Sequence, residues 1–583
     1  MHKNGKFNNH FKILAVVSIV LSTAVFGFSA PSTGQYMAPA AEDAQGGKPS
    51  FLMKTSLGSA LSAGRVGKAK FHDSKAMQVY YSTRENRPYW VGDSGPTGRA
   101  EKFLEILEAS WTHGLNPRKY HTDEIRGMIE HPNMMEKAEL ELLLTDAFIR
   151  YARDLSGMRI SPEAMKLDMK DWRAPMGSED VLGFLAEGKS FDRVIKDIEP
   201  KSPTYKKLQK ELVRLAQEDV GAYEQHLPIV FGGLMRPGWG HKAVPKLRDR
   251  MGLKQPEKNK MVYDDELAAA VMKFQRENEL MADGVIGDKT LQLLNRTKHD
   301  KMLQLIANME RLRWSEGEKP DRFIVVNIPS ATLWALDQGR VKLEMPVIVG
   351  SPWRRTRSFS TEVTGVRLNP KWTVPPTVKI FDIVPKIQED PNFLVDKGME
   401  LIKGYGSEAR TLDPSSIDWN TISKAELSKI RFIQTPGEHN PLGRVRILMP
   451  NEYNMYLHDT NHPELFDKPE RAVSSGCMRM KHPEKVASFV MDGYQGWGEN
   501  LMSEVFSAGK ETDFDIVKPV KVYVLYYTVW IGDKGQIVYG SDVYNYDSKL
   551  IDALAGIDGY HLPVHYVGGS GRIATRSEIA YSR

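Results

Sequence analysis

The sequence has 583 residues, of which 41% are hydrophobic and 26% are charged, with a net charge of +5 at pH 7. This composition is ordinary for soluble globular protein, and the length predicts about three to five domains. Basic residues are spread along the chain, and no Lys/Arg block forms the footprint expected of a nucleic-acid-binding protein. We therefore expect no nucleic-acid partner.

The first thirty residues are typical of an export signal. Lys3, Lys6 and Lys12 precede the apolar run Ile13–Ala30. This run is also nearly long enough to cross a bilayer, for which about 20 residues are needed, so an uncleaved anchor is the alternative to a cleaved signal peptide. Either way, we expect the rest of the chain outside the cytoplasm. Residues 31–71 are rich in Ala, Gly, Ser and Pro and predict a flexible linker.

Residues 72–227 have the apolar spacing of helices, as in the stretch 139–155, with breaks at Pro117 and Pro162. We expect a helical module without catalytic residues, and assign His113 to a cap or the core because no companion ligand pattern lies nearby. Residues 228–297 then read as helix, turn and helix. The residues Val271, Phe274, Gln275, Asp283, Gly284, Gly287, Thr290 and Leu294 resemble the pattern of the small three-helix peptidoglycan-binding domain.

The period changes to that of strands from Arg322 onward. We predict strands over 322–336 and 341–349, joined by a turn at 337–340, and further strands over 444–449, 454–457 and 520–531. Residues 379–430 are more helical and charged, which predicts a helical capping insertion; a purely structural elaboration is the alternative. The whole unit spans 298–550, and the tail 551–583 is loop-like.

The chain has one cysteine, Cys477, which leaves no partner for an internal disulfide in an exported protein. A buried, inert thiol is one explanation. Gly476 permits a tight turn, and the nearby Arg479 favours the thiolate. His458 ends a predicted strand nineteen positions upstream. These features favour a Cys–His nucleophile site as the second explanation.

The segment from His458 to Met480, HDTNHPELFDKPERAVSSGCMRM, resembles the catalytic signature of the L,D-transpeptidases. The HDT…SSGC form is similar to the large Gram-negative subfamily, whose members place a scaffold domain and a peptidoglycan-binding domain ahead of the catalytic domain. The resemblance implies a multidomain α+β protein. It would consist of a helical scaffold domain, a three-helix peptidoglycan-binding domain and a mainly-β catalytic domain with a helical capping insertion, located in the periplasm.

The resemblance also implies a reaction. Cys477 would take the acyl group of a donor tetrapeptide stem as a thioester, releasing D-alanine, and His458 would act as general acid and base. The acceptor would be the side-chain amine of diaminopimelate on a neighbouring stem, giving a 3→3 cross-link. The backbone N–H of Cys477 and the hydroxyl of Tyr456 would form the oxyanion hole. Asp459 would orient the imidazole, through its backbone carbonyl in preference to its side chain, which is the alternative.

Further residues complete the implied site. Ser475 and Gly476 belong to the motif, and Arg479 would either anchor a substrate carboxylate or brace the loop. Trp372 would form an aromatic wall for the substrate or belong to the core. No cofactor or metal is expected, whereas carbapenem-type inhibitors should acylate the cysteine. Alternative outcomes are an L,D-carboxypeptidase, an enzyme that anchors lipoproteins through the same thioester, and a non-catalytic wall-binding scaffold.

Overall fold

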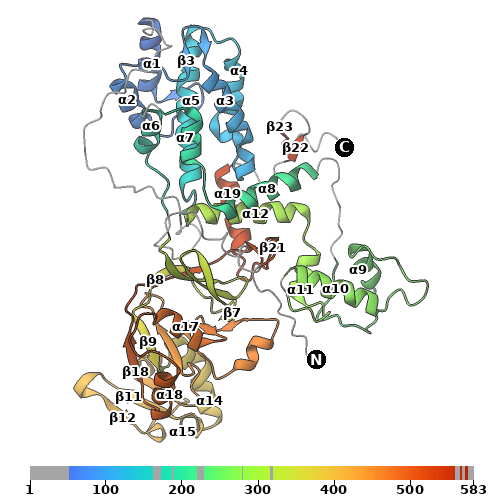
Figure 1. The fold of residues 1–583 in the computed structure, drawn as a ribbon, viewed down its shortest axis with the longest axis vertical. Coiled ribbons are helices and arrows are strands. Elements are labelled where there is room, and N and C mark those ends of the chain that lie inside the picture. The colour runs from blue at the N-terminus through green and yellow to red at the C-terminus, as the bar shows by residue number, and fades with distance from the viewer. Residues whose placement is uncertain are drawn as a thin grey trace, which may run out of the picture.

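The computed structural model describes residues 51–161, 173–186, 189–218, 229–278, 280–315, 319–558, 565–567 and 572–574. The expected signal or anchor at 1–30 lies outside these residues. The described chain forms a helical part, a mainly-β part and a small helical unit to one side, as Figure 1 shows. The predicted multidomain α+β class is therefore confirmed. Within the described ranges, no helix combines the length and apolar character needed to cross a bilayer.

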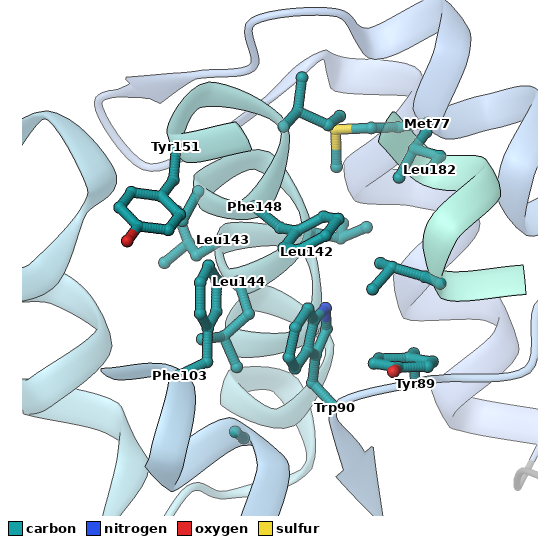
Figure 2. Close-up of a cluster of buried hydrophobic side chains, with 14 of the residues drawn as sticks. Met77, Tyr89, Trp90, Phe103, Leu142, Leu143, Leu144, Phe148, Tyr151 and Leu182 are labelled. Carbon is teal, nitrogen blue, oxygen red and sulfur yellow. The ribbon is translucent and has the colours of Figure 1, made fainter. Parts of the chain in front are cut away.

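The helical domain is built around one long central helix, α5 (Met134–Ser156), which begins with a capping box between Asn133 and Glu136. Its buried side chains meet those of the surrounding elements in one core, in which the Trp90 and Phe103 rings stack 5.1 Å apart (Figure 2). The other helices of this domain are α1 (Phe51–Ala63), α2 (Ser74–Thr83), α3 (Gly98–Glu108), α4 (Thr122–Ile129), α6 (Ser178–Ala186) and α7 (Phe191–Ile198). Two short hairpins accompany them, β1 (Arg65–Val66) with β2 (Ala69–Lys70) and β3 (Val91–Gly92) with β4 (Gly95–Pro96).

Residues 51–71, which we expected in the flexible linker, instead fold onto this domain. Met53, Leu57 and Leu61 recur every four residues along α1, so they share one face, and all three are buried in the helical core. The expected linker is therefore too long at its C-terminal end. Residues 31–50 lie outside the described residues.

A layer of three helices joins the helical domain to the β part: α8 (Pro203–Glu218), α12 (Lys298–Trp314) and α19 (Tyr546–Asp558). Buried Glu310 of α12 accepts hydrogen bonds from the guanidinium groups of Arg159 (2.8 Å) and Arg313 (2.5 Å). Residues 551–558 of the expected loop-like tail instead complete α19, because Leu554 is buried beneath α12 and α8. Beyond them, β22 (His565–Val567) and β23 (Arg572–Ala574) form a hairpin.

The small unit at the side contains three helices, as the resemblance implied: α9 (Val244–Arg250), α10 (Asp265–Glu277) and α11 (Asp288–Leu294). Gln275 lies buried at its centre. Its side-chain amide donates to the Val285 carbonyl at 2.9 Å, and its side-chain oxygen accepts from the Gly284 N–H at 2.9 Å. These hydrogen bonds hold the turn between α10 and α11 in place.

The β part is organised by one large sheet. Its strands run in the order β18-β9-β14-β15-β17-β7-β6-β5-β19-β8, and β16 pairs with β7. The strands are β5 (Arg322–Asn327), β6 (Thr332–Asp337), β7 (Arg340–Gly350), β8 (Phe359–Glu362), β9 (Gly365–Leu368), β14 (Val445–Leu448), β15 (Leu457–His458), β16 (Ala472–Ser474), β17 (Met478–Met480), β18 (Thr512–Asp515) and β19 (Lys521–Leu525).

Two sides of this sheet are covered differently. Along β5, Ile324 and Val326 enter the core of the β part, whereas Phe323 and Val325 pack into the cluster beneath α12 and α19. The helix α17 (Pro483–Val490) packs against β9 and β14, and α18 (Glu499–Ala508) packs against β9.

The predicted strand 322–336 breaks into two at residues 328–331. The prediction over 520–531 likewise divides into β19 and β20 (Val529–Ile531), which pairs with β21 (Ile537–Tyr539).

The insertion differs from the helical cap that we expected. It contains a four-stranded sheet in the order β10-β13-β11-β12, formed by β10 (Trp372–Thr373), β13 (Ile430–Gln434), β11 (Met399–Lys403) and β12 (Arg410–Leu412). Short helices flank it: α13 (Pro376–Val378), a π-helical turn (Lys379–Ile383), α14 (Val384–Glu389), α15 (Phe393–Asp396) and α16 (Lys424–Ser428). Ile430, Phe432 and Gln434 alternate along β13 and are buried on one of its faces. The charged residues around them made this alternation hard to recognise in the sequence.

Candidate active site

The candidate nucleophile and base lie on two neighbouring strands. β15 and β17 are parallel, with Leu457 opposite Met478 and His458 opposite Arg479. Leu457 and Met478 are both buried in the core below the sheet. Because successive side chains of a strand point to opposite faces, His458, Arg479 and Cys477 belong to the other face. The parallel pairing thus brings together residues from the two ends of the sequence motif.

The imidazole of His458 is held by the backbone. Its Nδ1 lies 2.5 Å from the carbonyl oxygen of Asp459, so the neutral ring donates from Nδ1 and keeps the lone pair on Nε2. The Asp459 carboxylate is turned elsewhere and accepts from the N–H groups of Arg444 (2.8 Å) and Thr460 (2.7 Å). Burial raises the pKa of this carboxyl. The contact with the ring is therefore through the main chain of Asp459.

Both members of the pair are neutral at neutral pH. Burial, followed by the positive charges of Arg479 and Arg446, lowers the pKa of His458 to about 3. Burial raises the pKa of the Cys477 thiol, and this outweighs the opposing effects of the Tyr456 N–H and the same two arginines. The charge of Arg479 does favour the thiolate, as we expected, but burial outweighs it and the thiol stays protonated in the resting site. The neutral imidazole keeps a lone pair on Nε2, which can accept the thiol proton when substrate binding brings the two groups together.

The turn before the cysteine is tightly fastened. Gly476 has φ +118°, a conformation that residues with a side chain rarely adopt. The Ser474 hydroxyl donates to the Cys477 carbonyl at 2.6 Å and accepts from the Gly476 N–H at 3.1 Å. Thr356 donates to the Gly476 carbonyl at 2.8 Å. These bonds fix the backbone that carries the sulfur.

The thiol itself points toward the carbonyl of Asn454, with Sγ 3.9 Å from that oxygen. Within the part of the chain that the structure describes, no hydrogen bond joins Sγ to the imidazole of His458. The two groups lie on the same sheet face, on or next to adjacent strands. Catalytic hydrogen bonds are often long in the free enzyme and shorten when substrate binds.

The remaining predicted residues divide into two groups. The Tyr456 hydroxyl donates to the Asn454 side chain at 3.4 Å, and Ser475 accepts from Arg354 at 3.0 Å, so both lie beside the turn. The structure does not bring Trp372 to this place: the side chain packs against the insertion's own core. Its position supports a core role.

Sequence reasoning missed Arg446. It lies directly opposite His458 on β14, and its guanidinium carbon is 3.6 Å from the centroid of the Tyr456 ring. Among the described residues, Nε of Arg446 and Nε of Arg479 are both buried without a hydrogen-bond partner. His458 is therefore flanked by two guanidinium groups. The alternation of Arg444, Val445 and Arg446 predicts a strand, but the pairing of that strand with the histidine strand is a long-range feature that the local sequence does not contain.

Comparison with known families agrees with this arrangement. Residues 75–212 match the scaffold domain, residues 248–294 match the family described as "Putative peptidoglycan binding domain", and residues 321–506 match the L,D-transpeptidase catalytic domain. The matches follow the order expected from the sequence. The chain therefore carries a scaffold domain, a peptidoglycan-binding domain and a catalytic domain of the L,D-transpeptidase family.

A curated relative from Haemophilus influenzae, named "Putative L,D-transpeptidase", is 34% identical over 257 residues, which is 44% of this chain. The chain spans half the length of that relative. Among solved structures, an Enterococcus faecium L,D-transpeptidase mutant is 12% identical, with a TM-score of 0.16 over 35% of this chain and 50% of that chain. An L,D-transpeptidase from Mycobacterium smegmatis is 11% identical, with a TM-score of 0.17 over 35% of this chain and 58% of that chain.

Proposed function

We propose that this protein is a peptidoglycan L,D-transpeptidase that forms 3→3 cross-links through a thioester on Cys477. The observation that carries the proposal is the parallel pairing of β15 with β17, which sets a backbone-anchored imidazole and the chain's one thiol on the same sheet face. The peptidoglycan-binding unit ahead of it supports a wall polymer as substrate. The proposed location is the periplasm, after export by the N-terminal segment.

In the first half of the reaction, the sulfur of Cys477 attacks the carbonyl at the L-centre of diaminopimelate in a donor tetrapeptide. The thiol proton passes to Nε2 of His458, which is neutral and available because its pKa is about 3. The C–N bond to D-alanine then breaks, and the proton on the imidazole goes to the departing amine. The product is a thioester between the donor and Cys477.

In the second half, the side-chain amine of an acceptor diaminopimelate attacks the thioester carbonyl. His458 takes the amine proton and returns it to the sulfur as the C–S bond breaks, which restores the thiol. The N–H of Cys477 is the proposed donor to the oxyanion, since the bonds that fasten Ser474 and Gly476 hold this backbone in place. We assign Arg479 and Arg446 to the stabilisation of negative charge at the sulfur and at substrate carboxylates.

The test is incubation of the full chain with purified disaccharide tetrapeptide under reducing conditions, followed by mass analysis of the products. A dimer that has lost one D-alanine is the expected result. A free tripeptide without dimer would show that water is the acceptor and would replace cross-linking by L,D-carboxypeptidase activity. Transfer only to a lysine-bearing lipoprotein peptide would identify an anchoring enzyme. Unchanged substrate with both the wild type and Cys477→Ala would contradict the proposal.

A further inference from the structure

A loop next to the catalytic turn carries an exposed aromatic ring. We call Gly350–Thr356, which begins at the last residue of β7, the Trp353 loop. Trp353 is 94% exposed, the largest exposure among the described large hydrophobic side chains. A tryptophan left this far in solvent contributes little to folding, because burial of its apolar surface is what stabilises a folded chain. The ring is therefore accessible to a ligand.

The Trp353 loop is fastened to the catalytic turn at both ends. The N–H of Ser351 donates to the Ser474 carbonyl at 2.9 Å, and Thr356 donates to the Gly476 carbonyl at 2.8 Å. Gly350 has no room for a side chain, since a Cβ there would lie 2.2 Å from the Arg354 carbonyl oxygen. The ring is thus carried on a loop whose geometry is fixed relative to Cys477, which is the condition for a subsite that aligns a substrate.

A groove of about 700 Å³ lies between this loop and the insertion. Trp353 forms one wall, and Phe381 of the π-helical turn, 66% exposed, forms another. Ser475, two residues before the nucleophile, also lines the groove. Arg354 joins these parts, because it donates to Ser475 at 3.0 Å and makes a two-pronged ion pair with Asp382 beside Phe381.

The charged residues that line the groove are all positive among the residues that the structure describes. Arg355, Arg357 and Lys549 contribute positive charge to the lining, and none of the described residues that line the groove is acidic. The arrangement combines two exposed aromatic faces with several cations beside the nucleophile. Aromatic faces suit the C–H-bearing face of a sugar ring, and the cations suit carboxylates on the peptide that follows it.

From this we infer that the groove is a subsite for the glycan-linked end of the donor, with its sugar ring against Trp353 and Phe381 and the acidic start of its stem peptide along Arg355 and Arg357. The inference rests on the proposed function, and it adds that the enzyme recognises the sugar as well as the stem peptide. A donor that lacks the sugar would lose the contact with Trp353 and keep the contacts of the peptide.

The experiment measures binding apart from turnover. The full chain with Cys477→Ala is titrated with disaccharide tetrapeptide and with the same tetrapeptide without sugar. Adding Trp353→Ala should raise the dissociation constant for the sugar-bearing ligand about tenfold and change that for the free tetrapeptide less than twofold. Trp353→Tyr should restore most of the difference, because it keeps an aromatic face. Since Trp353 is exposed, the thermal midpoint of each variant should equal that of its parent.

The matched control is Tyr405→Ala in the insertion, an aromatic side chain that is 75% exposed and does not line the groove. This change should leave the tenfold effect of Trp353→Ala intact. Equal losses for both ligands, no loss for either, or loss of the sugar preference through Tyr405→Ala alone would overturn the inference. Undetectable binding of both ligands at millimolar concentration would overturn it as well. If the Cys477→Ala chain binds both ligands as described but the wild-type chain turns over neither donor, the proposed function is refuted and the subsite inference stands.

Discussion

The resting state of the Cys477–His458 pair makes a prediction about thiol reactivity. Burial raises the pKa of Cys477 above its ordinary value of 9.0, and the pKa of His458 is lowered to about 3. At pH 7 the thiol and the imidazole are then both almost entirely neutral. A thiolate–imidazolium ion pair, by contrast, would hold the sulfur ionised over the whole range between the two pKa values. The two arrangements differ in the pH dependence of alkylation.

The assay is the rate of alkylation by iodoacetamide, followed by intact mass between pH 5 and pH 10. Every adduct at a thiol reports Cys477, because the sequence contains no other cysteine. We expect the rate to rise about tenfold per pH unit from pH 6 to pH 8, with no plateau in this range. His458→Gln should keep that slope. A rate that is constant from pH 5 to pH 8 in the wild type and lost in His458→Gln would refute the neutral-pair reasoning.

Three further predictions concern stability. Glu310→Ala leaves Arg159 and Arg313 buried without their shared carboxylate and should lower the free energy of unfolding by about 3–5 kcal/mol in denaturant titrations; an unchanged midpoint would contradict this. Thr356→Val leaves two buried backbone groups unpaired and should cost about 2 kcal/mol, while Cys477 becomes more accessible to alkylation. The pKa of buried His113 is about 3 against an ordinary 6.5, so the unfolded state takes up the proton first and stability falls as pH drops from 6.5 toward 3. His113→Phe should flatten that fall, by up to roughly 4 kcal/mol at the acid end.

Parts of the fold could be predicted because they depend on local patterns. The apolar period that shows at Leu267 and Val271 predicted the helix α10, and the alternation before and after the turn at 337–340 predicted β6 and β7. The insertion was harder to predict. Its strand β13 alternates between buried and half-buried positions, but the charged segments around it have the composition of solvent-exposed helices. In the insertion, packing between distant segments decides where strands form, and the local composition does not reveal it.

In the candidate site too, some residues could be predicted from local sequence and others could not. The spacing of His458 and Cys477 within one motif made the pair recognisable, whereas Arg446 depends on which strand lies beside β15. Strand order is a long-range property that no local pattern contains. The direction of the shift in thiol pKa could not be predicted for a similar reason. The charge of Arg479 is visible in the sequence, but the burial that outweighs it appears only once the sheet and the turn are assembled.

The most direct measurement for the central claim is the mass of the intact protein, quenched in acid within seconds of mixing with disaccharide tetrapeptide. The predicted result is a population of protein heavier by the donor without its terminal D-alanine, carried on the peptide that contains Cys477. His458→Gln should form this adduct far more slowly, and Cys477→Ala should not form it. An adduct of the same mass in Cys477→Ala, or active cross-linking in the wild type with no acyl-enzyme at any time point, would contradict catalysis through a thioester on this residue.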